Sequence, residues 1–99
     1  MTLRITPLAG RQIEAIREYL KERSPAAAIR VGQRFLQTFD LLVAMPLVGR
    51  KGALANTREF VVSRFPYVIV YRVDPDKDEV VILGVYHGAQ LRPGQEREK

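Results

Sequence analysis

At 99 residues the chain is long enough for one domain and too short for two, and its 46% hydrophobic and 27% charged residues exclude an intrinsically disordered chain. Sixteen basic against eleven acidic residues give a net charge of +5, which favours an anionic partner. The absence of cysteine excludes disulfides and thiolate metal sites, and one histidine leaves too few ligands for a zinc site, so we expect no metal and no cofactor.

The first ten residues, MTLRITPLAG, lack the long apolar core of a signal peptide. No apolar run in the chain approaches the ~20 residues that span a bilayer. We therefore expect a cytoplasmic protein with no membrane association. Leu3 to Ile5 alternates apolar and polar residues, which predicts a short first strand.

Two helices are predicted next, each opened by a hydroxyl residue and a proline. Thr6-Pro7 and Ser24-Pro25 fit an N-cap followed by the first helical position, where proline lacks an N–H that would be unpaired in any case. The first helix ends near Arg23 and the second runs to Met45-Pro46, which predicts a helical hairpin. The expected apolar stripes are Ala9, Ile13, Ile16 and Leu20 in the first helix, and Ile29, Gly32, Phe35, Leu36, Phe39, Leu42 and Val43 in the second.

A turn-rich basic loop is expected over 46–52, and from Thr57 the apolar period changes to two. Residues 57–63, 67–73 and 79–86 are predicted as three strands of an antiparallel meander. The fold class is therefore α+β in the order β-α-α-β-β-β, with the helical hairpin on one face of a small, mainly antiparallel sheet. The last two strands are apolar on both sides, so the face without helices is expected to be thinly protected or covered by a partner.

Positive charge gathers in the middle of the chain. The segment from Arg50 to Arg72 holds a single acid, Glu59, and its basic residues are Arg50, Lys51, Arg58, Arg64 and Arg72. Nucleic acid and an acidic protein are both candidate partners, and a basic surface without a partner is the plainer alternative. Aromatic residues interleave with these arginines and could stack on bases, although burial in the core explains them more simply; they are Phe65, Tyr67, Tyr71 and Tyr86.

The single histidine, His87, follows the last predicted strand, where its side chain could enter a groove. Its pKa range suits general acid or base chemistry. Metal-free RNA cleavage would also need a second proton-transfer group and cations on the phosphate, for which the available residues are Tyr86, Arg58, Arg64 and Glu59. A histidine that only hydrogen-bonds at a strand end is the simpler interpretation.

The order of these elements, together with several sequence strings, resembles the RelE/ParE toxin superfamily over roughly residues 3–93, and the ParE-like branch in particular. The strings are Ile13-Glu14-Ala15-Ile16, Ser24-Pro25-Ala26-Ala27-Ala28, Met45-Pro46, Thr57-Arg58-Glu59-Phe60, Pro66 through Val73, and Val80 through Gln90. The resemblance implies one toxin domain over residues 1–92, followed by a polar tail at 93–99.

The same resemblance implies the toxin of a type II toxin–antitoxin pair, held in a hetero-oligomer such as a heterotetramer with a cognate ParD-like antitoxin. ParE-like members poison DNA gyrase, and RelE-like members cut messenger RNA on the ribosome. A basic domain with an apolar sheet face is suited to bind an acidic segment that folds as it binds.

The nuclease pattern transfers incompletely to this sequence. The position before Tyr67-Val68 holds Pro66 where nuclease members carry a basic residue, and Gly88 stands where an aromatic residue follows the histidine. His87 matches a histidine of some nuclease members. Arg58 lies in a Thr-Arg-Glu string that resembles ParE-like chains, and two roles remain possible for it: a structural salt bridge to an acid, or a contact with phosphate. His87 and Arg58 are the candidate catalytic residues, and a gyrase-binding toxin without enzymatic activity is the favoured interpretation.

Overall fold

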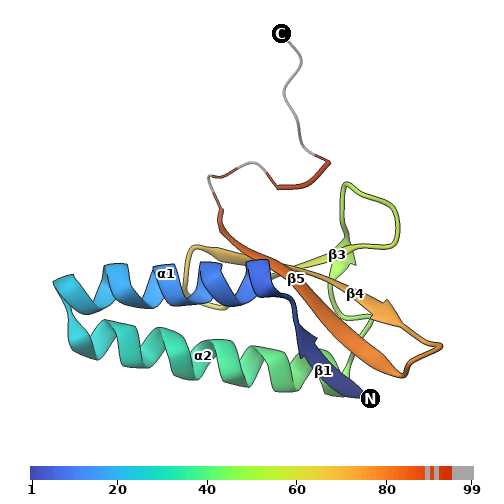
Figure 1. Cartoon of the computed structure of the whole chain (residues 1–99), viewed down its shortest axis with the longest axis horizontal. Coiled ribbons are helices and arrows are strands. Elements are labelled where there is room, and N and C mark those ends of the chain that lie inside the picture. Colours follow the sequence, from blue (N-terminus) through green and yellow to red (C-terminus); the bar gives the residue numbers. More distant parts are fainter. Residues whose placement is uncertain (89, 91, 95–99) are drawn as a thin grey trace, which may run out of the picture.

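The computed structural model describes residues 1–88, 90 and 92–94, and within them two antiparallel helices pack on one face of a five-stranded sheet (Figure 1). This is the predicted α+β architecture. The elements are β1 (Thr2–Ile5), α1 (Pro7–Arg23), α2 (Pro25–Ala44), β2 (Arg50–Lys51), β3 (Arg58–Val61), β4 (Tyr67–Asp74) and β5 (Glu79–His87). No helix in the described part of the chain is long and apolar enough to cross a bilayer.

Both helices begin at the predicted caps. The Thr6 hydroxyl accepts a hydrogen bond from the Ala9 N–H at 3.2 Å, and the Ser24 hydroxyl accepts one from the Ala27 N–H at 3.2 Å. Ser24 also ends α1, because its own N–H donates to Leu20 O at 2.7 Å. One residue therefore closes the first helix and opens the second, and the hairpin turn needs no further loop.

The strands lie in the order β1-β5-β4-β3-β2. The antiparallel meander β3-β4-β5 is as predicted. β1 runs parallel to β5 and pairs only with the first four residues of β5, 79–82. The prediction that 46–52 is loop throughout is wrong at Arg50–Lys51, which form β2 against Glu59 and Arg58. Two residues are too few to show an alternating pattern, which is why the sequence did not predict β2. This short strand is held by pairing with the backbone groups at the edge of β3.

The main core lies between the helices and the sheet. Its buried members are Ala9, Val31, Phe35, Phe39, Leu42, Val62, Tyr67, Ile69, Tyr71, Val80, Ile82 and Val85. The stripe predicted for α2 is wrong at two positions, because Ile29 and Leu36 are 62% and 65% exposed. Ala28 and Val31 are buried in their place, so the buried face of α2 is rotated away from these two residues.

The face of the sheet without helices is better covered than the sequence predicts. Val68, Val70 and Val81 point to this face, opposite the core residues that alternate with them, and each is at most 4% exposed. Arg92, which follows β5, lies over this face and is bonded to Glu59 of β3. The polar tail predicted for 93–99 lies outside the described residues from position 95 onward.

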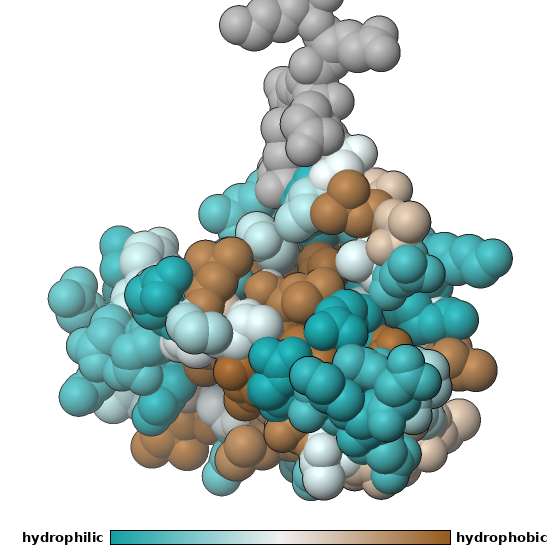
Figure 2. Space-filling view, turned by 45° about the vertical axis from the view of Figure 1, so that its right-hand side comes forward, coloured by the Kyte–Doolittle hydropathy of each residue, from teal (hydrophilic) through white to brown (hydrophobic). Residues whose placement is uncertain are grey.

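Apolar surface nevertheless remains exposed elsewhere. Large exposed apolar side chains are Leu8, Tyr19, Ile29, Leu36, Met45, Leu47, Leu54 and Val61, among others. Figure 2 shows hydrophobic surface gathered in the middle of one side of the molecule, between hydrophilic margins. Exposed apolar surface gathered in this way suits an interaction site.

Candidate functional site

Arg58 lies at the start of β3 and points to the helix side of the sheet, where it holds the loop that follows α2. Its Nη1 donates to Gly49 O at 2.8 Å and to Leu47 O at 3.3 Å. The salt bridge to an acid that the sequence left open is replaced here by bonds to backbone carbonyls. These bonds position the 46–49 loop against the sheet and engage the guanidinium group, which is the part of Arg58 that a phosphate would contact.

Tyr71 of β4, the pairing partner of Arg58, holds the same loop from inside the core. Its hydroxyl donates to Pro46 O at 2.8 Å and accepts from the Gly49 N–H at 2.9 Å. Burial raises the pKa of Tyr71, against the opposing effects of the Gly49 N–H and the Arg58 charge. A Cβ on Gly49 would lie 2.6 Å from the Tyr71 hydroxyl oxygen, so only glycine fits there. Arg58, Tyr71 and the loop residues they bind are called the loop network below.

His87 lies at the other end of the sheet, as the last residue of β5. Its ring meets the Tyr67 ring edge-on, with 6.1 Å between centroids. Burial raises the pKa of Tyr67, and the nearby Tyr19 adds to this effect. A cavity of about 600 Å³ adjoins the two rings; its lining residues are Gln12, Ala15, Ile16, Tyr19, Pro66, Tyr67, Val85, His87 and Gln90.

Three of the residues proposed for RNA cleavage, Arg58, Tyr86 and His87, do not converge. Arg58 pairs with Tyr71 and His87 pairs with Tyr67, so the register separates them by four positions along β4, or about 13 Å. Tyr86 neighbours His87 in sequence but points to the opposite face, where its ring lies against Gly84. The described structure therefore places the candidate base, arginine and tyrosine in three separate surroundings.

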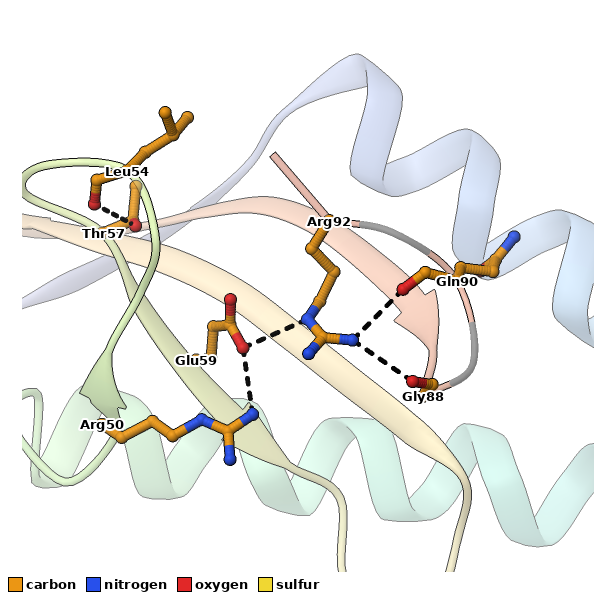
Figure 3. A network of polar contacts seen from close by, with 7 residues as sticks. All are labelled: Arg50, Leu54, Thr57, Glu59, Gly88, Gln90 and Arg92. Carbon is orange, nitrogen blue, oxygen red and sulfur yellow. Dashed lines mark hydrogen bonds and ion pairs between the residues drawn. The ribbon is translucent and has the colours of Figure 1, made fainter. Parts of the chain in front are cut away.

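Glu59 is the centre of an ion network on the helix-free face. The sequence marked it only as the lone acid of a basic region and as one of the residues available for RNA cleavage, and did not predict this network. Its Oε1 accepts from Arg50 Nη2 and from Arg92 Nε, each at 3.1 Å, and its side chain is 4% exposed (Figure 3). Arg92 also donates to Gly88 O and Gln90 O, at 3.4 and 3.3 Å. Through these bonds the segment after β5 is held over β3.

The basic region is thus mostly engaged within the fold. Besides Arg50 and Arg58, Arg72 pairs with Asp74 at 3.5 Å, and the pKa of Asp74 is lowered chiefly by the Lys77 N–H bond, with Arg72 adding to the effect. Tyr67 and Tyr71 are core residues, as the simpler interpretation of the aromatic residues requires. Within the described residues no cluster of three or more His, Cys, Asp or Glu side chains is arranged to hold a metal ion.

Comparison with known proteins identifies the family. The family described as the ParE toxin of the type II toxin–antitoxin system parDE matches residues 3–92. The chain belongs to the ParE toxin family. The resemblance stated from the sequence strings is confirmed by this match, and the chain is a toxin of the RelE/ParE superfamily of type II toxin–antitoxin systems.

Relatives and solved structures agree with this membership. The putative toxin Y4kP of Sinorhizobium fredii is 38% identical over 91 residues, which are 92% of each chain. Toxin RelE3 of Caulobacter vibrioides is 33% identical over 93 residues, covering 92% of this chain and 98% of the relative.

Two solved structures share the fold. The chromosomal ParDE system of P. aeruginosa gives a TM-score of 0.77 at 24% identity, with 88% of this chain and 95% of that one covered. The RelBE2 toxin–antitoxin complex of Mycobacterium tuberculosis gives 0.60 at 29% identity, with 87% and 95% covered. The ParE-type toxin fold therefore extends over nearly all of the chain.

Proposed function

We propose that this ParE-family toxin inhibits DNA gyrase in the cytoplasm without being an enzyme, and that a cognate ParD-like antitoxin neutralises it in a hetero-oligomer such as a heterotetramer. The observation that carries the proposal is the match to the ParE toxin family over residues 3–92. The solved neighbours are described as toxin–antitoxin systems, which supports an antitoxin as the partner. The net charge of +5 and the exposed apolar side chains suit an acidic, partly apolar partner segment.

The dispersed placement of the candidate catalytic residues also supports a binding protein. Metal-free RNA cleavage needs an acid, a base and phosphate-binding cations within hydrogen-bond reach of one phosphate. Here Arg58 is bonded to loop carbonyls, and the register separates it from His87 by about 13 Å. A gyrase-binding surface needs no such convergence.

A RelE-like endoribonuclease acting on ribosome-bound messenger RNA is the alternative function. Two observations favour it: His87 borders an open cavity beside Tyr67, and one relative is named toxin RelE3. In that case His87 would be the proton-transfer group, with Arg64, which lies in the turn before Pro66 of the same cavity, on the phosphate.

Expression of the chain without an antitoxin tests the proposal. We expect growth arrest with DNA breaks and intact transcripts, measured in one culture by pulsed-field electrophoresis and by primer extension. Transcript cleavage with intact DNA would establish the alternative, and harmless accumulation of folded protein would contradict both functions.

His87→Ala separates the two functions further. If gyrase is the target, the variant keeps its toxicity within about twofold, because a solvent-facing side chain outside the core is removed without any loss of chemistry. Complete loss of toxicity in a variant with an unchanged circular dichroism spectrum would favour the nuclease. Tyr19→Phe is the matched control, because it changes another side chain that lines the same cavity and leaves the imidazole of His87 in place.

A further inference from the structure

A second cavity lies at the opposite end of β4 from the cavity beside His87. It has a volume of about 780 Å³ and is lined by residues 51–58, by Leu47, and by Val73 and Pro75 at the end of β4 and just after it. Val73 lines this cavity and Tyr67 lines the other, and the six positions between them extend over about 20 Å. The two cavities therefore belong to separate surfaces of the toxin.

Most of the wall is the loop 52–57, which is fixed by its own hydrogen bonds. The Gly52 N–H donates to Thr57 O at 2.8 Å, and the Thr57 hydroxyl donates to Leu54 O at 2.7 Å. Asn56 takes a left-handed backbone conformation with a φ of 64°, which closes the turn. Figure 1 shows this loop, which precedes β3, projecting from the rest of the sheet. A partner can therefore bind it without the entropy cost of ordering a loop.

Two leucine side chains on this wall take no part in the core. Leu47 and Leu54 are 67% and 47% exposed, and neither belongs to the core cluster. The loop network uses the carbonyl of Leu47 and not its side chain. Figure 3 shows the Leu54 side chain pointing away from Thr57, to which its carbonyl is bonded. Folding leaves both side chains in water, so their burial can stabilise a complex with another protein.

The charges around the cavity indicate the chemistry of the partner. Lys51 and Arg58 line it, and none of its lining residues is acidic. A nucleic acid would meet two leucines here, together with a guanidinium group that Arg58 already shares with two backbone carbonyls. A second copy of the chain would bring another +5 to a basic surface, so like-charge repulsion disfavours it. An apolar side chain flanked by carboxylates, on another protein, matches both the leucines and the cations.

We propose that this cavity and the side chains of Leu47, Lys51 and Leu54 around it form the surface through which the toxin docks on its protein target. An apolar side chain of the target enters the cavity beside the two leucines, and neighbouring carboxylates of the target pair with Lys51 and Arg58. The fixed loop suits a target that is already folded, because neither partner has to be ordered on binding. That the partner is the toxin's target rests on the proposed function; the site and its chemistry rest on the cavity, the leucines and the charges.

Leu54→Asp tests the surface in cells that express the chain without its antitoxin. The added carboxylate repels an acidic target and removes the apolar contact, so we expect at least tenfold weaker growth inhibition, with an unchanged circular dichroism spectrum and undiminished binding of the coexpressed antitoxin. Leu36→Asp is the matched control: Leu36 is 65% exposed on α2, outside the cavity, and its variant stays toxic. Full toxicity of Leu54→Asp would overturn the proposal. Loss of antitoxin binding together with toxicity would assign the surface to the antitoxin and overturn it as well.

Lys51→Glu and Lys51→Arg test the charge of the surface separately from its apolar part. Lys51 is exposed in the two-residue strand β2, where any of these side chains points to water. We expect Lys51→Glu to weaken growth inhibition at least fivefold and Lys51→Arg to keep it, since arginine retains the positive charge. Equal toxicity of the two variants would overturn the acidic character assigned to the target.

A synthetic probe tests the chemistry without reference to toxicity. The probe is an acetylated, amidated pentapeptide with one phenylalanine between two pairs of acidic residues, titrated into the purified full-length chain. We expect millimolar binding with the largest amide NMR shifts at Leu54 and Thr57, and at least fivefold weaker binding when lysines replace the acids or alanine replaces the phenylalanine. Absence of shifts at these amides, or equal binding of either altered peptide, would overturn the proposal.

Two other occupants of the cavity give different results in the same measurements. Gly94 lies beside the loop, since a Cβ on it would be 2.9 Å from atoms of Ala53 and Leu54, and the five residues that follow it include two glutamates. If removal of residues 95–99 strengthens peptide binding at least tenfold, the chain's own tail is the occupant and the proposal is overturned. Self-association of the free chain that Leu54→Asp abolishes in sedimentation would identify a second copy as the occupant, with the same consequence.

The docking surface and the proposed function can fail separately. Peptide binding at Leu54 by a chain that is harmless in cells would contradict the toxin function and support the chemistry of the site. A chain that breaks DNA in cells as strongly with Leu54→Asp as without it would support the toxin function and overturn the docking surface.

Discussion

The loop network and the outer edge of β5 beyond its pairing with β1 both join polar side chains to backbone groups, but they differ in burial. This edge, residues 83–87, is called the β5 edge below. Tyr71 is fully buried, and together with Arg58 it makes four bonds to the short stretch from Pro46 to Gly49. At the β5 edge Gln12 and Gln90 each accept one bond from a strand N–H, of Val85 and His87 respectively, and both border an open cavity. The same kind of bond therefore fixes the 46–49 loop in the loop network, whereas at the β5 edge the glutamine side chains can be replaced by water or by another chain.

The physical reason for the difference is access to water. A backbone group that loses its partner inside the core stays unsatisfied, whereas a group beside an open cavity can bond to water or to another chain. Candidate functional residues are consequently better sought at the β5 edge than in the loop network, although the sequence strings directed attention to Arg58.

Tyr71→Phe is the change with the largest expected effect on this comparison. It leaves the buried Gly49 N–H and Pro46 carbonyl without their partner, so the free energy of unfolding falls by about 2 kcal/mol. Urea unfolding followed by circular dichroism measures the loss. Tyr19→Phe is the matched control and changes stability by less than about 0.5 kcal/mol, because Tyr19 is 55% exposed. Equal losses in the two variants would contradict the assigned role of the loop network.

The features that the sequence predicted correctly are local. The caps at Thr6 and Ser24 depend on residues three positions apart, and the strand alternation depends on neighbours, so both are visible in a short window. The features that it missed join distant residues: Arg92 to Glu59 across 33 positions, and Gln12 to Val85 across 73. No local pattern marks such a pair, since glutamine on a helix is an ordinary exposed residue.

The candidate site shows the same limit. Arg58 and His87 were selected by residue type and by family strings, which indicate what a side chain can do but not what it contacts. The structure gives Arg58 two carbonyl partners and places His87 against Tyr67 at a cavity. An exposed strand end could be predicted for His87, and a loop could be predicted after the second helix, whereas the contacts of Arg58 with that loop could not.

Alkaline titration provides a second, smaller test of the loop network. Because burial raises the pKa of Tyr71 in the folded chain, the unfolded chain ionises this residue first, at pH about 10. The stabilising contribution is complete below that pH and is lost as the pH rises through the higher folded value. The Tyr71→Phe variant lacks this contribution. Above pH 10 we therefore expect the stability of the variant to fall less steeply than that of the natural chain. Urea unfolding midpoints at successive pH values measure the two slopes. Parallel slopes would contradict the inference that Tyr71 stays protonated when folded.

Gln12→Ala tests the other side of the comparison and has the smallest expected effect on stability. The Val85 N–H loses its partner but gains access to water through the cavity, and alanine favours the helix slightly more than glutamine, so unfolding changes by less than about 1 kcal/mol. The local effect is larger: hydrogen exchange at the Val85 amide accelerates, while exchange at Ile69 in β4 stays slow. A loss of stability as large as that of Tyr71→Phe would show that Gln12 is a structural residue and would contradict the difference drawn between the two regions.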